Sequence, residues 1–177
     1  MEKVIYFKNE NGEKDYCVAG VYKSFLDYAF LKADYFMLVY INFYGQGLSE
    51  KQAYFKDRLS KFEVKRRNNP KWPGVLGMIC RDTTYEVIFY STSPEAKDAL
   101  NEVSAMSDWS RPGMPEDLAF FTGNQCWFYS VGHEKIAAIV RASCEDIEFV
   151  ELHGLASREK AFVCTDGYYE QYDEELI

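Results

Sequence analysis

The chain has 177 residues, of which 47% are hydrophobic and 17% aromatic, and it carries a net charge of −8. This length fits one domain, and the apolar content is sufficient for a buried core. The acidic balance argues against nucleic acid as a partner, and the longest apolar run, "YFMLVYINFYG", is only about half the roughly 20 residues that a membrane-spanning helix needs.

The cysteines are odd in number, widely spaced and contain no C-x-x-C pair. This pattern favours free thiols in a reducing cytoplasm over a disulfide framework, and it lacks the paired ligands of a zinc site. The opening residues, "MEKVIYFKNENGEKDY", do not resemble a secretory signal peptide. We therefore expect a cytoplasmic protein that needs no metal or other cofactor and does not enter a membrane.

The first predicted elements are the two strands of a β-hairpin. "KVIYF" (3–7) and "DYCVAG" (15–20) flank a polar loop, as the strands of a hairpin do. From Tyr22 to about Asn42 the apolar spacing favours a helix, although residues 35–44 are equally compatible with a strand.

A second helix is predicted to begin at Ser49, where Gln52 stands at the capping-box position. It should run to about Arg67, because "NNPKWPG" then interrupts the pattern. We expect the two helices to pack as an antiparallel hairpin.

The second half of the chain gives clearer signals. "GVLGMIC" (74–80) and "YEVIFYS" (85–91) predict strands, and a helix over 93–106 follows, with Ser93 as its cap and Pro94 at its first position. "LAFF", "CWFYSV" and "IAAIVRA" then predict three strands joined by the turns "TGNQ" and "GHEK".

Two short elements complete the chain: a helix over 143–154 and an edge strand over 160–165. Because both Ser93 and Ser143 precede an acidic helix start and follow paired strands, a ββα duplication is one interpretation.

These elements predict an α+β fold with a mainly antiparallel sheet and helices packed on one face. We expect a single domain over 1–177, with a part rich in helices at about 20–70, a part rich in strands at about 75–165 and an acidic C-terminal segment at 166–177.

The negative charge is concentrated at the C-terminal end. Residues 1–143 carry 18 basic and 18 acidic residues, whereas residues 144–177 carry two basic and ten acidic ones. Such a field attracts basic partners, although a solvated acidic terminus that aids solubility is the simpler interpretation. The tyrosines of "DGYYEQYDEELI" favour docking, because tyrosine is enriched at interfaces.

The loop "WSRPGM" offers two further interface residue types, which could equally close over the sheet as core. The predicted partner-binding residues are Trp109, Arg111, Tyr168, Tyr169, Glu170, Tyr172, Asp173, Glu174 and Glu175. The opposing basic cluster in "KFEVKRRNNPKWPG" is interpreted as the cationic end of the second helix, where it complements the helix dipole.

Catalytic groups are few. Cys126 and His133 would lie roughly 23 Å apart in an extended strand, too far for a nucleophile and its base. Ser130 lies nearer to His133, and a small hydrolase-like enzyme could use this pair with Glu116 or Asp117. Glu116 and Asp117 suit the first turn of a short element or a loop, and two adjacent acids point in different directions, whereas acid–base work needs them to converge. The strand serine also lacks a nucleophile elbow.

The segments "RPGMPEDLAFF" and "CWFYSVGHEKIAAI", within residues 111–140, and the overall character of the chain resemble small intracellular immunity proteins of bacterial polymorphic-toxin systems. The resemblance implies a single α+β domain that binds a cognate toxin and blocks its active site. A phage-encoded inhibitor of a host defence protein is similar at this level. The leading hypothesis is therefore an inhibitor-type binding protein with a basic toxin or nuclease as its partner, and the alternative is the hydrolase-like enzyme.

Overall fold

The computed structural model describes residues 2–8, 15, 17–75, 77, 80–110, 113–156 and 162–164. Its strands are β1 (Glu2–Tyr6), β2 (Tyr35–Asn42), β3 (Glu63–Asn68), β4 (Thr84–Ser91), β5 (Glu116–Thr122), β6 (Gln125–Val131), β7 (Ile136–Ile139) and β8 (Phe162–Cys164). Its α-helices are α1 (Ala19–Lys32), α2 (Glu50–Leu59), α3 (Pro94–Leu100) and α4 (Cys144–Leu152).

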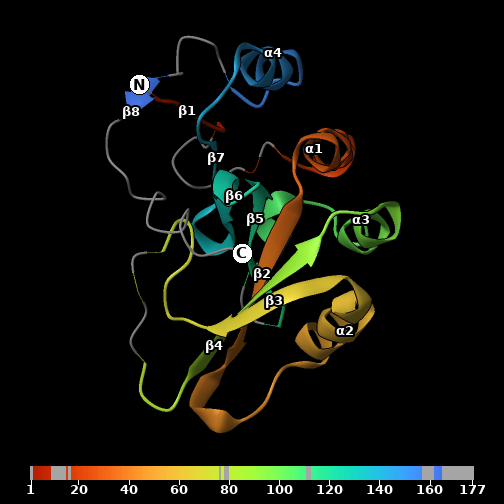
Figure 1. The fold of residues 1–177 in the computed structure, drawn as a ribbon, viewed down its shortest axis with the longest axis vertical. Coiled ribbons are helices and arrows are strands. Elements are labelled where there is room, and N and C mark those ends of the chain that lie inside the picture. Colours follow the sequence, from red (N-terminus) through yellow and green to blue (C-terminus); the bar gives the residue numbers. More distant parts are fainter. Residues whose placement is uncertain are drawn as a thin grey trace.

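The strands form one 8-stranded sheet in the order β3-β4-β2-β5-β6-β7-β1-β8, and all described strand pairs are antiparallel. The helices lie along one side of this sheet (Figure 1). The predicted fold class, an α+β domain with a mainly antiparallel sheet and helices on one face, is confirmed. None of the described helices has the length and hydrophobicity required to span a bilayer.

The second half of the chain folds largely as its local signals predict. β5, β6 and β7 form consecutive antiparallel pairs, and β8 lies at the edge of the sheet beside β1. Ser93 caps α3 by accepting a hydrogen bond from the backbone N–H of Ala96 at 3.1 Å. Ser143 and Asp146 form a reciprocal capping box at the start of α4. α3 is shorter than predicted and ends at Leu100.

The predicted hairpin between residues 3–7 and 15–20 is wrong. β1 forms as expected, but its partners are β7 and β8, which lie far away in the sequence. The second segment instead leads into α1, which begins at Ala19. β1 pairs with strands that lie far away in the sequence, and the residue spacing within β1 does not identify those partners.

The predicted helix from Tyr22 to Asn42 divides into a helix and a strand. α1 ends at Lys32, and β2 begins at Tyr35. β2 pairs with both β4 and β5, and six of its consecutive residues are buried. A strand covered on both faces shows no alternation of apolar and polar residues, so its sequence does not distinguish it from a buried helix. The helix hairpin is also wrong, because β2 separates α1 from α2 along the chain.

The second helix begins as predicted and ends early. Ser49 accepts the N–H of Gln52 at 3.1 Å, whereas the Gln52 side chain donates to the carbonyl of Met114 instead of returning to the cap. α2 ends at Leu59, and the basic residues that follow form the edge strand β3. Strand β4 pairs with β3 and with β2. A strand was also predicted over 74–80, but the described residues of that segment lie outside the strands.

Two clusters of buried apolar side chains lie on opposite faces of the sheet. The larger one joins helix residues such as Phe25 to strand residues such as Phe120. The second contains Met37 and Phe89 from the strands together with Trp72 from the segment after β3. The sheet is thus buried on both faces along much of its length.

Candidate functional site

Most of the predicted partner-binding residues belong to the acidic C-terminal segment. Tyr168, Tyr169, Glu170, Tyr172, Asp173, Glu174, Glu175 and also Arg111 lie outside the described residues. The acidic end of the chain is described over 144–156 and 162–164, and its described acids, Glu145, Asp146, Glu148 and Glu151, all lie on α4. The site can therefore be built from α4 and the helix beside it.

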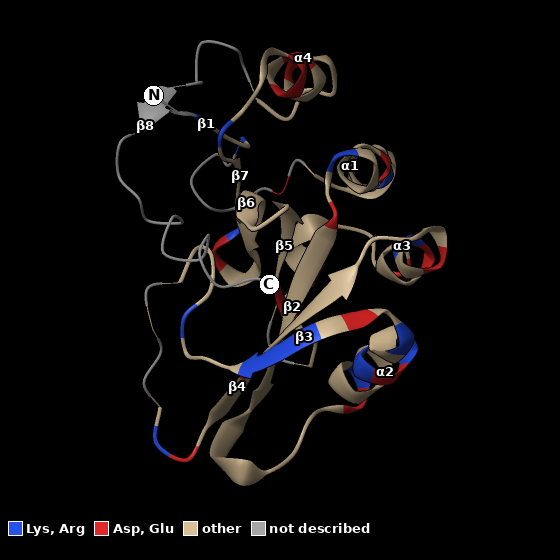
Figure 2. Ribbon diagram, viewed as in Figure 1, with Lys and Arg blue, Asp and Glu red and all other residues tan. Residues whose placement is uncertain are grey.

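One face of α4 is acidic and exposed. Glu148 and Glu151 are exposed, and the side chain of Glu145 is 82% exposed. At 100° per residue these positions lie within about a third of the helix circumference. Leu152 falls within the same sector and is 83% exposed. The helix therefore presents an apolar side chain among three carboxylates, as Figure 2 shows in part by the red segments of α4.

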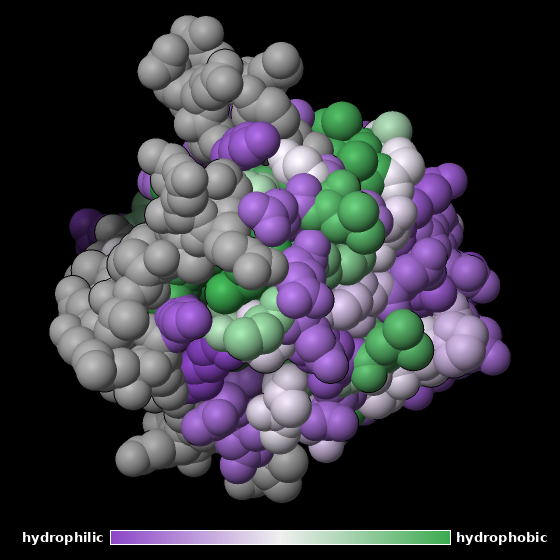
Figure 3. Space-filling model, turned by 90° about the horizontal axis from the view of Figure 1, so that it is seen from above, coloured by the Kyte–Doolittle hydropathy of each residue, from purple (hydrophilic) through white to green (hydrophobic). Residues whose placement is uncertain are grey.

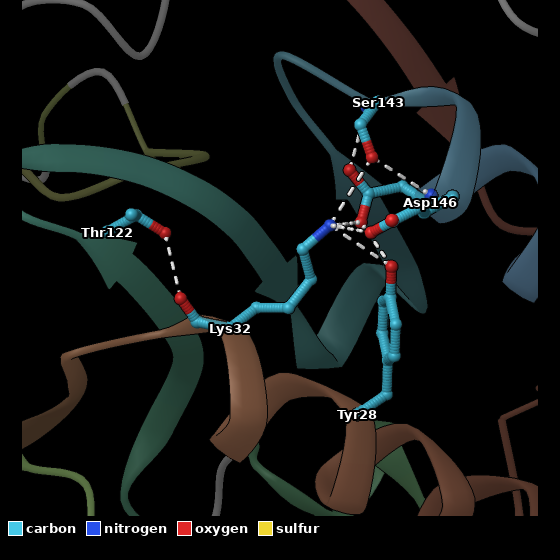
Figure 4. A network of polar contacts seen from close by, with 6 residues as sticks. Tyr28, Lys32, Thr122, Ser143 and Asp146 are labelled. Atoms are coloured by element: carbon cyan, nitrogen blue, oxygen red, sulfur yellow. Dashed lines mark hydrogen bonds and ion pairs between the residues drawn. The ribbon is translucent and has the colours of Figure 1, made fainter.

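A network of polar contacts holds α4 against the end of α1 (Figure 4). Lys32 donates to Asp146 Oδ1 at 2.7 Å and to the Ser143 hydroxyl at 3.3 Å. The Tyr28 hydroxyl also donates to Asp146 Oδ1, at 2.7 Å. The Tyr28 ring stacks on Phe149 of α4 at a centroid distance of 4.1 Å. Because these contacts occupy the inner side of α4, its outward face remains acidic.

The network perturbs two ionisable groups. Burial alone disfavours the Asp146 carboxylate, but hydrogen bonds from Lys32, the Ser143 backbone and Tyr28 outweigh it and lower the pKa of Asp146. Burial and the neighbouring Asp146 raise the pKa of Tyr28 far above its usual range. At neutral pH the pair is therefore a carboxylate that accepts and a phenol that donates.

The prediction that Trp109 anchors a partner is wrong. Its side chain is fully buried and packs edge-on against Phe55, with ring centroids 5.2 Å apart. Its indole N–H donates to the Tyr22 hydroxyl at 2.9 Å, which donates in turn to the carbonyl of Leu100 at 2.9 Å. Trp109 and Met114 both belong to the core cluster on the helix side of the sheet, so Trp109 contributes to folding and not to an exposed contact.

The basic cluster also differs from its prediction, because it lies on β3 and not at a helix end. Figure 2 shows β3 as a basic strand at one edge of the sheet. Arg66 donates to Glu63 at 2.8 Å and to Glu86 at 2.9 Å, and the guanidinium of Arg67 lies 5.6 Å from the centroid of the Phe89 ring. These side chains are engaged with their own sheet.

The hydrolase hypothesis requires an accessible serine, and Ser130 is not one. Ser130 is buried, and its hydroxyl donates to the carbonyl of Leu118 at 2.9 Å. Cys126 is buried as well, and the register shift opposite Phe120 and Phe121 turns it to the other face of the sheet from Phe128. The regular alternation of side chains along β6 is therefore interrupted at this β-bulge.

Glu116, Asp117 and His133, in contrast, do converge. One ligand atom from each lies within 4.8 Å of the others, and both carboxylate side chains are buried. The expectation that the two neighbouring acids point apart is wrong, because Asp117 has a left-handed backbone with φ of 56°. The register of β5 against β2 also shifts in this region, which ends the regular alternation.

Asp117 is held firmly in place. Its Oδ1 accepts the backbone N–H of Gly132 at 2.9 Å, and its Oδ2 accepts the indole N–H of Trp72 at 2.7 Å. An added Cβ on Gly132 would lie 1.9 Å from the carbonyl oxygen of Trp109, so this turn requires glycine. The hydrogen bond between Asp117 and Gly132 therefore holds the start of β5 against the turn after β6.

The sequence offers Glu116, Asp117 and His133 as candidate site residues, but it gives no sign of the contact between Lys32 and Asp146. The Ser143–Asp146 capping box was visible in the sequence, whereas the lysine that joins it comes from another helix. No protein-family model, curated protein or solved structure significantly matches the chain.

Proposed function

We propose that the protein is an intracellular inhibitor of the immunity-protein kind, which neutralises a basic toxin or nuclease through an acidic, partly aromatic surface. The observation that carries the proposal is the outward face of α4. Glu145, Glu148 and Glu151 surround Leu152 there, at the end of the chain where the whole net charge is concentrated.

This face combines the two properties that a docking surface for a cationic protein needs. Opposite charge raises the rate of encounter, and apolar contact then slows dissociation. Leu31 at the end of α1 is 86% exposed and precedes Lys32, which contacts α4. Viewed from the end that carries α4, hydrophobic surface interrupts the hydrophilic surface over α4 and α1 (Figure 3).

A hollow beside this surface offers a place for a projecting side chain. It has a volume of about 430 Å³, lies between α1 and α3 and is lined in part by Phe30, Leu31 and Pro94. Asp27 on its wall forms an ion pair with Lys97 at 2.5 Å. Anchors that fill such hollows dominate the binding energy of many interfaces.

The experiment uses the product of the gene that adjoins the one encoding this chain, if that product is a toxin. Co-expression should protect growth, and calorimetry should show a complex that weakens as salt is raised. Glu148→Lys with Glu151→Lys should weaken binding at least about tenfold, by reversing the field of α4. Asp57→Lys with Asp98→Lys changes the net charge equally on α2 and α3 and should leave binding unchanged.

Deletion of residues 166–177 tests the C-terminal tyrosines and acids separately, and it should also weaken binding and reduce its salt dependence. If the toxin does not bind, or binds the α4 variant and the truncated chain as tightly as the parent, the proposal is wrong. His133→Ala separates the two functional classes, because an inhibitor keeps its binding whereas a hydrolase dependent on His133 loses its activity.

A further inference from the structure

Glu116, Asp117 and His133 form a cluster that the proposed inhibitor surface does not use. We propose that these three residues bind one divalent transition-metal ion, such as Mn²⁺ or Zn²⁺. The antiparallel register of β5 and β6 pairs Ala119 with Tyr129, which brings the start of β5 opposite the turn after β6. Both acids and the histidine therefore meet at one end of a strand pair.

The spacing suits metal coordination. The three ligand atoms lie within 4.8 Å of one another, and ligand atoms around a bound zinc ion are about 3–3.5 Å apart. The side chain of His133 is 40% exposed and lies in a turn, so it is the ligand least constrained by its surroundings. The two carboxylates are buried and fixed on the strand, so they form the inner part of the site.

The donor set indicates which ions fit. Two carboxylates and a neutral imidazole balance the charge of a divalent cation, and the cation replaces repulsion between neighbouring carboxylates by attraction. An imidazole nitrogen favours zinc, manganese or iron over magnesium and calcium, which prefer oxygen ligands alone. Three protein ligands leave a position for water or for a group of another molecule.

Neighbouring groups orient the ligands. Asp117 accepts a hydrogen bond on each oxygen, from Gly132 N–H and from the Trp72 indole, and these bonds fix its carboxylate. Glu134 Oε1 lies 3.7 Å from His133 Nε2. This carboxylate is near the imidazole but beyond hydrogen-bond distance, so the fixed contacts of the site are those of Asp117.

The site is tested by titrating the purified full-length chain with MnCl₂ and following the electron paramagnetic resonance signal of free Mn²⁺. Mn²⁺ is chosen because thiolates bind it poorly, so the cysteines do not compete. We expect one ion per chain. His133→Ala should weaken binding by at least about 10- to 100-fold, and Glu116→Gln should weaken it similarly.

His153→Ala is the matched control, because His153 lies at the end of α4, where it hydrogen-bonds to the Phe149 carbonyl at 2.9 Å. It should bind Mn²⁺ as the parent chain does. Since His133 is exposed, its replacement should leave the circular dichroism spectrum and thermal midpoint of the metal-free chain unchanged. Absence of Mn²⁺ binding by the parent, or binding by the His133 variant that equals the parent's, would overturn the proposal.

Discussion

Lys32 of α1 and Asp146 of α4 form a close ion pair, with Nζ and Oδ1 2.7 Å apart, that joins two helices far apart in the sequence. The aspartate is buried, whereas the lysine is a quarter exposed. Asp146 also completes the capping box of α4, so one carboxylate both starts the helix and attaches it to α1.

Asp146→Asn should therefore destabilise the protein by about 2–3 kcal/mol, because it removes the nearer of the two carboxylates that pair with Lys32 and weakens the cap. Urea denaturation followed by circular dichroism measures this free energy. Glu145→Gln is the control. Its carboxylate is 82% exposed and 3.8 Å from Lys32, so the loss should stay below about 0.5 kcal/mol.

The same pair predicts a pH dependence of stability. Because the pKa of Asp146 is lowered in the folded state, the stability that it contributes is fully present above its ordinary pKa of 3.8 and is lost as the pH falls through the lowered value. Measured from pH 6 down to about pH 2, the parent should lose more stability than Asp146→Asn. Parallel curves for the two proteins would contradict this assignment.

Trp109 should behave as a core residue and not as a contact residue. Trp109→Ala should cost about 3–5 kcal/mol through the cavity, while Trp109→Phe should cost less but leave the Tyr22 hydroxyl without its indole donor. Thermal denaturation measures both. Leu31→Ala, at a side chain 86% exposed, should change stability by no more than about 0.5 kcal/mol.

Gly132 should tolerate no side chain. In Gly132→Ala the new methyl group would meet the Trp109 carbonyl, so we expect a loss of several kcal/mol, on the order of other severe overpacking changes. Gly20→Ala is the matched variant, since an added Cβ on this α1 residue would contact nothing within 4 Å. It should stabilise the chain by about 0.4–1 kcal/mol.

The basic residues of β3 should protect the sheet edge. Lys65→Val with Arg66→Val removes charge from a strand where Val64 is already exposed, so light scattering should report faster aggregation. Lys23→Val with Lys51→Val removes equal charge from α1 and α2 and should aggregate no faster than the parent. Equal rates for the two double variants would show that net charge, and not the strand edge, governs solubility.

The sequence predicted the elements whose signals are local. The turns after β5 and β6, the serine cap of α3 and the acidic start of α4 each depend on a few neighbouring residues, and all formed as expected. β2 was not predictable in the same way, because its buried run "YFMLVYIN" fits either a helix or a central strand until its partners β4 and β5 are known.

The same distinction between local and long-range signals applies to the candidate site. The residue types at Glu116, Asp117 and His133 were recognised, but their convergence depends on the left-handed backbone of Asp117, which no spacing rule indicates. The sequence leaves core and interface equally open for Trp109, because a tryptophan in a loop has the same composition signal in both places. The burial of the side chain, and not the residue type, distinguishes a core tryptophan from an interface tryptophan.

The sheet has a thermodynamic consequence of its own. It insulates the side chains on the helix side, such as Phe25, from those on the opposite side, such as Met37, because the two sets belong to separate clusters. A packing defect introduced on one side should therefore add to a defect on the other without synergy. The two clusters thus contribute separately to the free energy of unfolding, and the side chains on one side of the sheet could be redesigned while those on the other are left unchanged.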